Sequence, residues 1–263
     1  MELNYKHLGN GAPLIILHGL FGTMDNWQSL GKKLAEEYSV YLVDQRNHGR
    51  SPHVPVHDYV SLAEDIVDFM VERGLPSATL LGHSMGGKVA MEFALQYPEM
   101  MEKLIVVDIA PKQYSGGHER IFQALLALDL HTIEDRSEAE AVLGRFIEDK
   151  GTLQFLLKNL SRHKDGHFEW KMNLPVLHRY YPEIMGPPVA RGYFAGETLF
   201  IRGGNSDYVL DSDWPDIHAY FPNAQLLTIP GAGHWVHADA PEELLSAVHT
   251  FLKGEAVPGA IRG

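Results

Sequence analysis

The chain has 263 residues, of which 45% are apolar and 21% charged, and its formal net charge at pH 7 is −12 with histidine neutral. This composition excludes a mainly disordered chain and is typical of one large globular domain or two small ones. Such an excess of acidic groups repels phosphate backbones, so nucleic-acid binding is not expected.

The sequence contains no cysteine, which excludes disulfides, thiolate metal sites and a cysteine nucleophile. The first residues carry neither the basic run nor the apolar run of a signal peptide. Every apolar run is shorter than the roughly 20 residues of a membrane-spanning helix. We therefore expect a cytoplasmic protein without stable membrane insertion.

Six short apolar runs, rich in aliphatic and β-branched residues, follow one another along the chain. They do not alternate with polar residues, which is typical of parallel strands buried on both faces. The first dozen residues are expected to form a short antiparallel lead-in. The six predicted strands are residues 14–17, 40–43, 79–81, 104–107, 198–201 and 226–229.

Apolar residues at helical spacing fill the gaps between these strands. They predict helices over residues 59–70, over residues 85–97 before Pro98, and from Pro241 to Leu252 before Gly254. Alternating strands and helices indicate right-handed crossovers, with helices on both faces of the sheet.

The long stretch between Asp108 and Thr198 has no good strand signal. A helical insertion at the carboxyl end of a strand is well placed to cover a site at that edge. We therefore expect a discontinuous core of residues 1–111 and 191–254, a helical cap of residues 112–190, and a flexible tail of residues 255–263. The helical patterns in the cap are residues 121–128, 138–148, 153–160 and 174–180.

Ser84 lies in the strongest motif, Gly82-His83-Ser84-Met85-Gly86-Gly87, between a predicted strand and a predicted helix. This is the G-x-S-x-G pattern in its required setting of strand, tight turn and helix. Glycines keep space open around the serine hydroxyl, and the helix N-terminus directs its N–H groups and positive dipole at it. The alternative is a plain glycine-rich turn. The context favours Ser84 as a nucleophile.

The loop His18-Gly19-Leu20-Phe21-Gly22 follows the first core strand, at the same edge of the sheet. Two backbone N–H groups that point at one position can stabilise an oxyanion. We expect the N–H groups of Leu20 and Met85 to form such a pair. Taken alone, the loop would be an ordinary glycine turn.

His234 lies in Gly231-Ala232-Gly233-His234-Trp235, directly after the last core strand. The order serine, acid, histidine along the chain is the one that this architecture uses. His234 is therefore the candidate base, although an isolated surface histidine is the alternative. His237 lies three residues on, and a His-x-x-His pair without a third ligand is a poor metal signal, so neither a metal nor another cofactor is expected.

Taken together, these motifs resemble those of the α/β-hydrolases, and specifically the YbfF-like esterases. The resemblance implies a mostly parallel eight-stranded sheet flanked by helices, a helical cap inserted after the sixth strand, and serine ester hydrolysis with Ser84 as nucleophile and His234 as base. The matching stretches span nearly the whole chain in order and are residues 18–22, 44–51, 82–88, 107–111, 203–206 and 231–237.

Two carboxylates are candidates for the third member of the triad. Most α/β-hydrolases place the acid after the seventh strand, where this chain has Asp207, whereas the YbfF-like group resembles a variant with the acid after the sixth strand, here Asp108. Both loops end near the loop of His234, so spacing does not choose between them. We favour Asp108 and keep Asp207 as the alternative.

The remaining singled-out residues are expected to be structural. The segment 44–51 should pin a loop through charge-assisted hydrogen bonds, and His83 should be a packed or hydrogen-bonded neighbour of Ser84. Aromatic and aliphatic cap residues should pack in the cap, with some of them facing the cleft. These residues are Phe122, Leu125, Phe155, Trp170, Leu177, Tyr180 and Tyr181.

The predicted function is hydrolysis of carboxylic esters of short to medium acyl chain by a monomer or homodimer acting on a small-molecule ester or thioester. The alternatives are an acyl-thioesterase or a carbon–carbon bond hydrolase on the same fold. A different class is a non-catalytic small-ligand receptor, because the fold does not fix the function.

Overall fold

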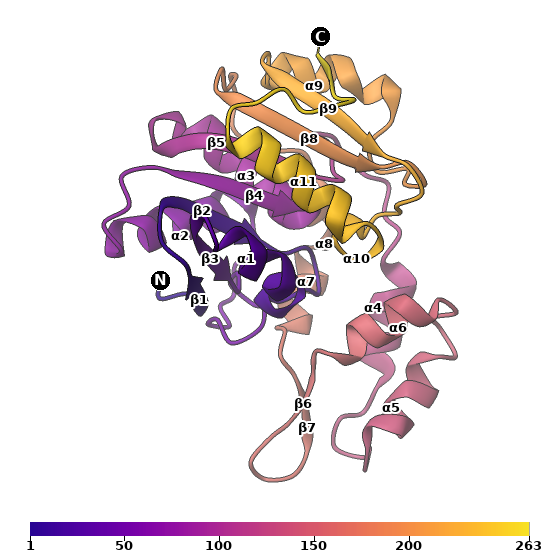
Figure 1. Cartoon of the computed structure of the whole chain (residues 1–263). Coiled ribbons are helices and arrows are strands. Elements are labelled where there is room, and N and C mark those ends of the chain that lie inside the picture. The colour runs from indigo at the N-terminus through magenta and orange to yellow at the C-terminus, as the bar shows by residue number, and fades with distance from the viewer. Residues whose placement is uncertain (263) are drawn as a thin grey trace.

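The computed structural model describes residues 1–262 and contains a twisted eight-stranded sheet in the order β1-β3-β2-β4-β5-β8-β9-β10 (Figure 1). The six inner strands pair in parallel, while β1 runs antiparallel to β3 and β10 antiparallel to β9. The predicted fold class and the antiparallel lead-in are confirmed. The strands are β1 (Tyr5–Leu8), β2 (Ala12–Leu17), β3 (Tyr38–Val43), β4 (Ala78–His83), β5 (Met101–Val107), β8 (Glu197–Gly203), β9 (Ala224–Ile229) and β10 (Ile261–Arg262).

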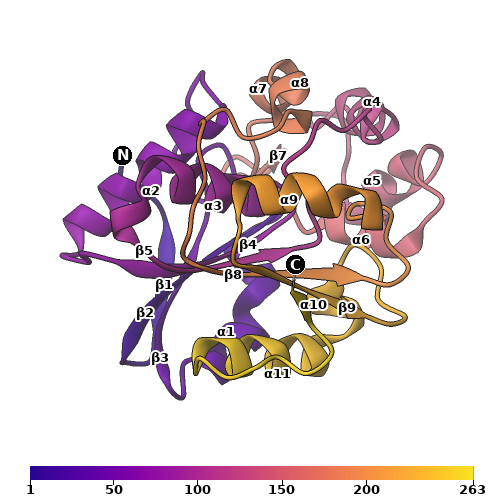
Figure 2. The same cartoon turned by 90° about the horizontal axis from the view of Figure 1, so that it is seen from above.

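Helices cover both faces of the sheet (Figure 2). On one face lie α1 (Gln28–Leu34) and α11 (Pro241–Leu252); on the other lie α2 (Tyr59–Glu72), α3 (Met85–Gln96) and α9 (Trp214–Tyr220). The short α10 (Val236–Asp239) follows the loop after β9, and three 3₁₀ turns occupy Met24–Trp27, Pro98–Met100 and Asp211–Asp213.

The central strands supply side chains to both layers of the core. Along β2, Leu14 and Ile16 pack in the cluster under α1 and α11, and Ile15 and Leu17 pack in the cluster under α2 and α3. All four are buried. Because successive side chains of a strand point to opposite faces, an uninterrupted apolar run is what a sheet covered on both sides requires.

The helix ends follow local sequence signals. The carboxylate of Asp58 caps α2 by accepting a hydrogen bond from the Ser61 N–H at 2.8 Å. Helix α11 begins at Pro241, and Gly254 follows its end with φ +75°, a conformation that favours glycine.

The segment of residues 112–190, which we call the inserted segment, lies over the carboxyl ends of the parallel strands. It follows β5, which is the fifth strand of this chain rather than the sixth, because among residues 1–262 a single antiparallel strand precedes the parallel ones. It also contains an antiparallel hairpin that the sequence did not predict, since strands of three residues are too short to show a pattern. Its elements are α4 (Glu119–Ala127), α5 (Arg136–Leu143), α6 (Lys150–Leu157), β6 (Leu160–Arg162), β7 (Phe168–Trp170), α7 (Leu174–Arg179) and α8 (Tyr181–Met185).

Two buried charged residues of α3 hold the ends of the inserted segment. The ammonium group of Lys88 donates hydrogen bonds to the carbonyl oxygens of Lys112 and Met185, both at 3.1 Å, and also to that of Gly186. One turn further on, the carboxylate of Glu92 accepts the N–H of Val189 at 2.6 Å and that of the next residue. The helix that follows Ser84 therefore holds both the start and the return of the inserted segment.

The segment predicted to be a flexible tail, residues 255–263, contacts the core over part of its length, and Gly263 lies outside the described residues. Ile261 and Arg262 pair with Leu226 and Gln225 on the outer edge of β9, and Val257 is buried against the core. An open strand edge offers unpaired backbone groups, and here the end of the chain satisfies some of them.

Candidate active site

Ser84 occupies a sharp turn between β4 and α3. Its backbone has φ +53° and ψ −120°, a strained conformation for a residue with a side chain. A Cβ atom on Gly82 would overlap the backbone of Gly86, and one on Gly86 would overlap the carbonyl oxygen of Leu17. The turn therefore requires both glycines, and it leaves the serine side chain at the carboxyl edge of the sheet.

Three side chains from distant parts of the chain meet at this turn. Nε2 of His234 lies 3.0 Å from Oγ of Ser84, and Nδ1 of His234 lies 2.7 Å from Oδ2 of Asp108. The ring of Tyr208 stacks on the His234 ring, with centroids 3.7 Å apart and planes 17° apart. The imidazole is thus fixed in its plane and hydrogen-bonded at both nitrogens.

Asp108 sits directly after β5 with φ +53° and is fully buried. Its Oδ1 accepts the N–H of Gly203 at 3.0 Å, and its Oδ2 also accepts the hydroxyl of Ser206. Asp207 is exposed, and it forms no hydrogen bond or ion pair with any residue in the range 1–262. Of the two candidate acids, the structure therefore brings Asp108, and not Asp207, to His234.

The backbone N–H groups of Leu20 and Met85 have no hydrogen-bond partner within the described chain. Both residues line a small recess that also includes Ser84. Unpartnered donors next to a hydroxyl can bind a developing oxyanion. The backbone of Phe21, at φ +61°, and a hydrogen bond of 2.9 Å from the Gly22 N–H to the Gly19 carbonyl keep this loop folded next to the serine.

Two buried imidazoles support the loop that carries Leu20. His18 donates from Nδ1 to the carbonyl of Gly19 at 2.8 Å and accepts the N–H of Gln45 at Nε2, 3.1 Å away. His48 accepts the Phe21 N–H at Nε2, 3.3 Å away. Burial lowers the pKa of His18, and lowers that of His48 well below the usual range for histidine. Both rings are therefore neutral, as their mixed donor and acceptor contacts require.

His83 lies between two other imidazoles, with its ring centroid 4.9 Å from that of His234 and 5.0 Å from that of His237. Nε2 of His83 donates to the carbonyl oxygen of His234 at 2.8 Å, which holds the loop after β9 against the turn of Ser84. Burial lowers the pKa of His83 well below its usual range, and the neighbouring His234 lowers it further. His237 stacks on Trp27 with centroids 4.6 Å apart.

The segment 44–51 is structural, as expected. The carboxylate of Asp44 accepts the N–H groups of Met24 at 2.8 Å and Arg50 at 3.0 Å. Arg46 forms a bidentate ion pair with the buried Asp65, at 2.5 and 2.8 Å. These charge-assisted contacts fix the loop beside the site and place neither charge next to Ser84.

A cavity of about 510 Å³ opens beside Ser84, between the sheet edge and the inserted segment. Of the seven cap residues singled out from the sequence, Phe155 is the one that lines it within the described chain. The other lining residues of the inserted segment are Gly117, His118, Ile121, Asp149, Gly151, Thr152 and Leu156. Phe122 and Leu125 are instead buried in the core. Helical periodicity identified the helices but could not tell which face meets the core and which meets the cavity.

Three further residues contribute to the site without a pattern that predicts their roles, namely Lys88, Ser206 and Tyr208. Tyr208 packs on the imidazole, Ser206 donates to the acid, and Lys88 holds the inserted segment. Lys88 and Ser206 lie in the stretches 82–88 and 203–206, which match the motifs of the YbfF-like esterases. This match is the sequence signal that could have identified the two residues.

Comparison with known proteins identifies the family. A model described as "alpha/beta hydrolase fold" matches residues 12–241. The chain belongs to the α/β-hydrolase family. It is 39% identical to "Esterase YbfF" of Escherichia coli (strain K12) over 92% of this chain and 94% of that protein, and 40% identical to "sn-1-specific diacylglycerol lipase ABHD11" of Mus musculus over 96% and 85%.

A solved structure titled "Marine microorganism esterase" superposes with a TM-score of 0.92 at 42% identity, covering 96% of this chain and 98% of that one. The expected resemblance to YbfF-like esterases is confirmed, and this α/β-hydrolase is an ester-cleaving enzyme. No helix within residues 1–262 has the length and apolar character needed to cross a bilayer.

Proposed function

We propose that this α/β-hydrolase is a serine carboxylesterase with the triad Ser84, His234 and Asp108 and a covalent acyl-enzyme. The observation that carries the proposal is the continuous hydrogen-bonded chain from the buried carboxylate through the imidazole to the serine hydroxyl, with distances of 2.7 and 3.0 Å. A nucleophile, a base and a group that orients the base, each within hydrogen-bond reach of the next, form the minimal unit for acyl transfer.

In the proposed first step, Oγ of Ser84 attacks the ester carbonyl carbon while Nε2 of His234 takes the hydroxyl proton. The carbonyl oxygen becomes an oxyanion that accepts the N–H groups of Leu20 and Met85. The imidazolium, stabilised by Asp108, then gives its proton to the leaving alkoxide as the carbon–oxygen bond of the ester breaks.

In the second step, a water molecule enters from the cavity. His234 takes a proton from this water, the hydroxide attacks the acyl carbon, and the same proton returns to Oγ of Ser84 as the acid product leaves. Apart from substrate and water, every group in the cycle is a side chain or backbone amide of this chain, so the proposed reaction uses no cofactor.

The two spaces that adjoin Ser84 support an orientation for the substrate. The cavity of about 510 Å³ includes His234, whereas the recess of about 20 Å³ includes Met85 and not His234. The leaving group must lie near the imidazole that protonates it, so we assign the alcohol to the cavity and the acyl group to the recess. A volume of about 20 Å³ holds one water-sized group, which favours acetyl and other short acyl groups.

Residues 112–190 are proposed to be a cap over this site. The support is that α4 and α6 supply cavity walls, while α8 closes the acyl recess through Ile184 and Met185. The absence of cysteine supports a cytoplasmic location, which fractionation of the producing cells would test.

The proposed triad is tested by active-site titration with a fluorophosphonate, followed by peptide mapping. One equivalent of label on Ser84, with none bound by Ser84→Ala, supports the nucleophile assignment. Label on any other residue rejects it. Binding of a chromogenic acetyl ester without steady-state turnover would instead support the receptor alternative.

Substrate orientation is tested with a series of p-nitrophenyl esters and the matching acyl-thioesters. From acetyl to octanoyl we expect kcat/KM to fall by about 10- to 100-fold, since overfilling a packed recess costs about 1–3 kcal/mol. Ile184→Ala should raise the ratio of octanoyl to acetyl turnover, whereas Ile121→Ala, in the cavity wall, should leave it unchanged. An octanoyl ester hydrolysed at least as well as acetyl would reject the assignment of the recess.

A further inference from the structure

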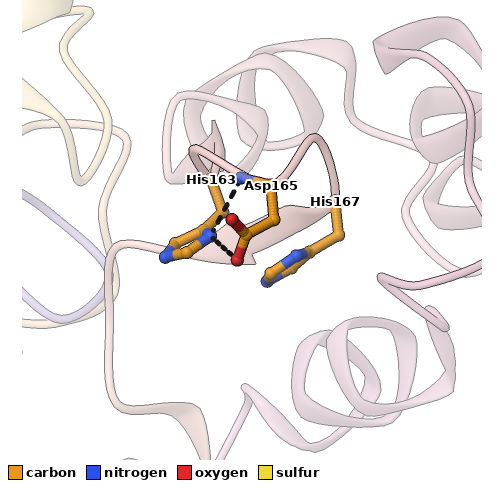
Figure 3. Close-up of side chains that lie close together, drawn as sticks. All are labelled: His163, Asp165 and His167. Atoms are coloured by element: carbon orange, nitrogen blue, oxygen red, sulfur yellow. Dashed lines mark hydrogen bonds and ion pairs between the residues drawn. The ribbon is translucent and has the colours of Figure 1, made fainter.

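A five-residue turn at the tip of the β6–β7 hairpin brings together three metal-ligating side chains. His163, Asp165 and His167 each offer one ligand atom, and these atoms lie within 4.8 Å of one another. Figure 3 shows the carboxylate of Asp165 between the two imidazoles, all on one side of the turn. The hairpin projects away from the sheet (Figure 1), and the residues of the turn line neither the cavity nor the recess beside Ser84.

The backbone of the turn preorganises these side chains. The N–H of His163 donates to the carbonyl of His167 at 2.8 Å, and the N–H of Gly166 donates to the carbonyl of His163 at 3.0 Å. Gly166 has φ +95°, a conformation that favours glycine, so the chain reverses sharply enough to place residues 163 and 167 opposite each other. The ligand positions are therefore set by the hairpin itself.

The spacing of the ligand atoms suits a small divalent ion. Nδ1 of His163 lies 3.1 Å from Oδ2 of Asp165. Two ligands on a tetrahedral zinc ion, with bonds of about 2.0–2.1 Å, lie roughly 3.4 Å apart. The rings of His163 and His167 stack with centroids 4.6 Å apart, so rotations about the side-chain bonds are needed to turn both ring lone pairs toward one ion.

Without an ion, the hydrogen-bonding requirements of Nδ1 of His163 conflict. Its Nδ1 faces the Asp165 carboxylate at 3.1 Å, which calls for a protonated nitrogen, and the Asp165 N–H at 3.3 Å, which calls for a lone pair. One nitrogen of a neutral ring cannot do both. A cation placed between the lone pair and the carboxylate resolves this conflict.

A third histidine stands next to the turn. The ring of His131, from the loop between α4 and α5, lies 5.3 Å from the ring of His167. The N–H of Phe168 donates to the carbonyl of Leu130 at 3.3 Å, so a backbone hydrogen bond holds this loop beside the hairpin. The turn itself carries one lysine, Lys164, which is exposed to solvent.

We propose that His163, Asp165 and His167 form a binding site for a late divalent transition metal, with Zn²⁺ as the best fit and His131 as a fourth ligand. Imidazole nitrogens select ions such as zinc, nickel and copper over magnesium and calcium, which prefer oxygen ligands throughout. An ion held by His131 together with the hairpin would tie the end of α4 to β6 and β7. The site would stabilise the inserted segment from outside the catalytic cavity, and it does not depend on the proposed triad.

The test is isothermal titration of the full-length, tag-free, chelator-treated protein with ZnCl₂, alongside thermal unfolding with and without the ion. We expect saturable binding of one Zn²⁺ per chain and a higher Tm in its presence. The double variant H163Q/H167Q should lose this binding and the shift in Tm. H131Q should weaken the binding by at least about 10-fold.

The matched control is H249Q, which removes a half-buried histidine that faces a single carboxylate, that of Glu37 at 3.5 Å. It should bind Zn²⁺ as the unmodified protein does. Without added metal, the double variant should keep the esterase activity of the unmodified protein, which separates this proposal from that of the triad. The proposed site would be overturned if the unmodified protein showed no saturable binding of Zn²⁺. It would also be overturned if the double variant still bound Zn²⁺, since the ion would then sit at other histidines. If H131Q bound Zn²⁺ with unchanged affinity, His131 would be rejected as the fourth ligand.

Discussion

Replacing Asp108 by Asn tests the proposed triad most sharply, because the structure determines how the amide must sit. Oδ1 of Asp108 accepts the Gly203 N–H, so in Asp108→Asn the carbonyl oxygen keeps that position and the NH₂ group takes the place of Oδ2. Oδ2 is the atom that faces Nδ1 of His234 at 2.7 Å. The new amide would donate where the carboxylate accepted.

The consequence is a change of tautomer. Nδ1 of His234 would become the acceptor, so Nε2 would carry the proton and donate to Oγ of Ser84, which leaves no base for the hydroxyl proton. We expect kcat to fall by about 10⁴-fold, the loss typical of this substitution in a serine–histidine–aspartate triad. This loss corresponds to about 5.5 kcal/mol of transition-state stabilisation.

The assay is steady-state hydrolysis of p-nitrophenyl acetate, with circular dichroism and urea unfolding to confirm that the variant is folded. Asp207→Asn is the matched control, since Asp207 is exposed and forms no hydrogen bond or ion pair with His234. It should retain kcat within about 2-fold, as expected of a surface change. If Asp207→Asn were the inactive variant and Asp108→Asn the active one, the argument from the geometry would be refuted.

Three further predictions concern the fold around the site. Gly86→Ala should lower the free energy of unfolding by about 3 kcal/mol and abolish esterase activity, because the new Cβ would overlap a carbonyl oxygen of β2. A urea midpoint equal to that of the unmodified protein would contradict this prediction. Lys88→Met should lower the free energy of unfolding by about 3 kcal/mol and make the inserted segment sensitive to limited proteolysis, since three backbone carbonyls lose their donor. An unchanged cleavage pattern would show that the hydrogen bonds of Lys88 do not hold the segment.

The third of these predictions is acid instability. Burial lowers the pKa of His57 to about 3 and lowers those of His48 and His83 well below their usual range, so the unfolded chain binds protons that the folded protein does not. The contribution of these three neutral rings to the free energy of unfolding is complete above about pH 6.5 and is lost as the pH falls. Between pH 7.5 and 5.5 the free energy of unfolding should decrease by about 1.4 kcal/mol per histidine, or about 4 kcal/mol for the three. Urea midpoints that agree at these two pH values would show that the rings are not held neutral.

The sequence alone determined the parts of this protein that depend on local patterns. Uninterrupted apolar runs identified the strands of a buried parallel sheet, and Pro241 and Gly254 marked the limits of α11, because these signals act through neighbouring residues. The two glycines around Ser84 likewise located the turn, since a turn of this tightness tolerates no side chain there.

Only the tertiary structure decided which residues meet at the site. Asp108 and Asp207 follow neighbouring strands at the same sheet edge, and spacing does not reveal that the Gly203 N–H and the Ser206 hydroxyl converge on Asp108. The same limit applies to the inserted segment. The residues of the inserted segment that line the cavity are set by contacts between segments. The hairpin and the clustering of His163 with His167 depend on the path of a short turn. Neither kind of contact produces a periodic pattern in the sequence.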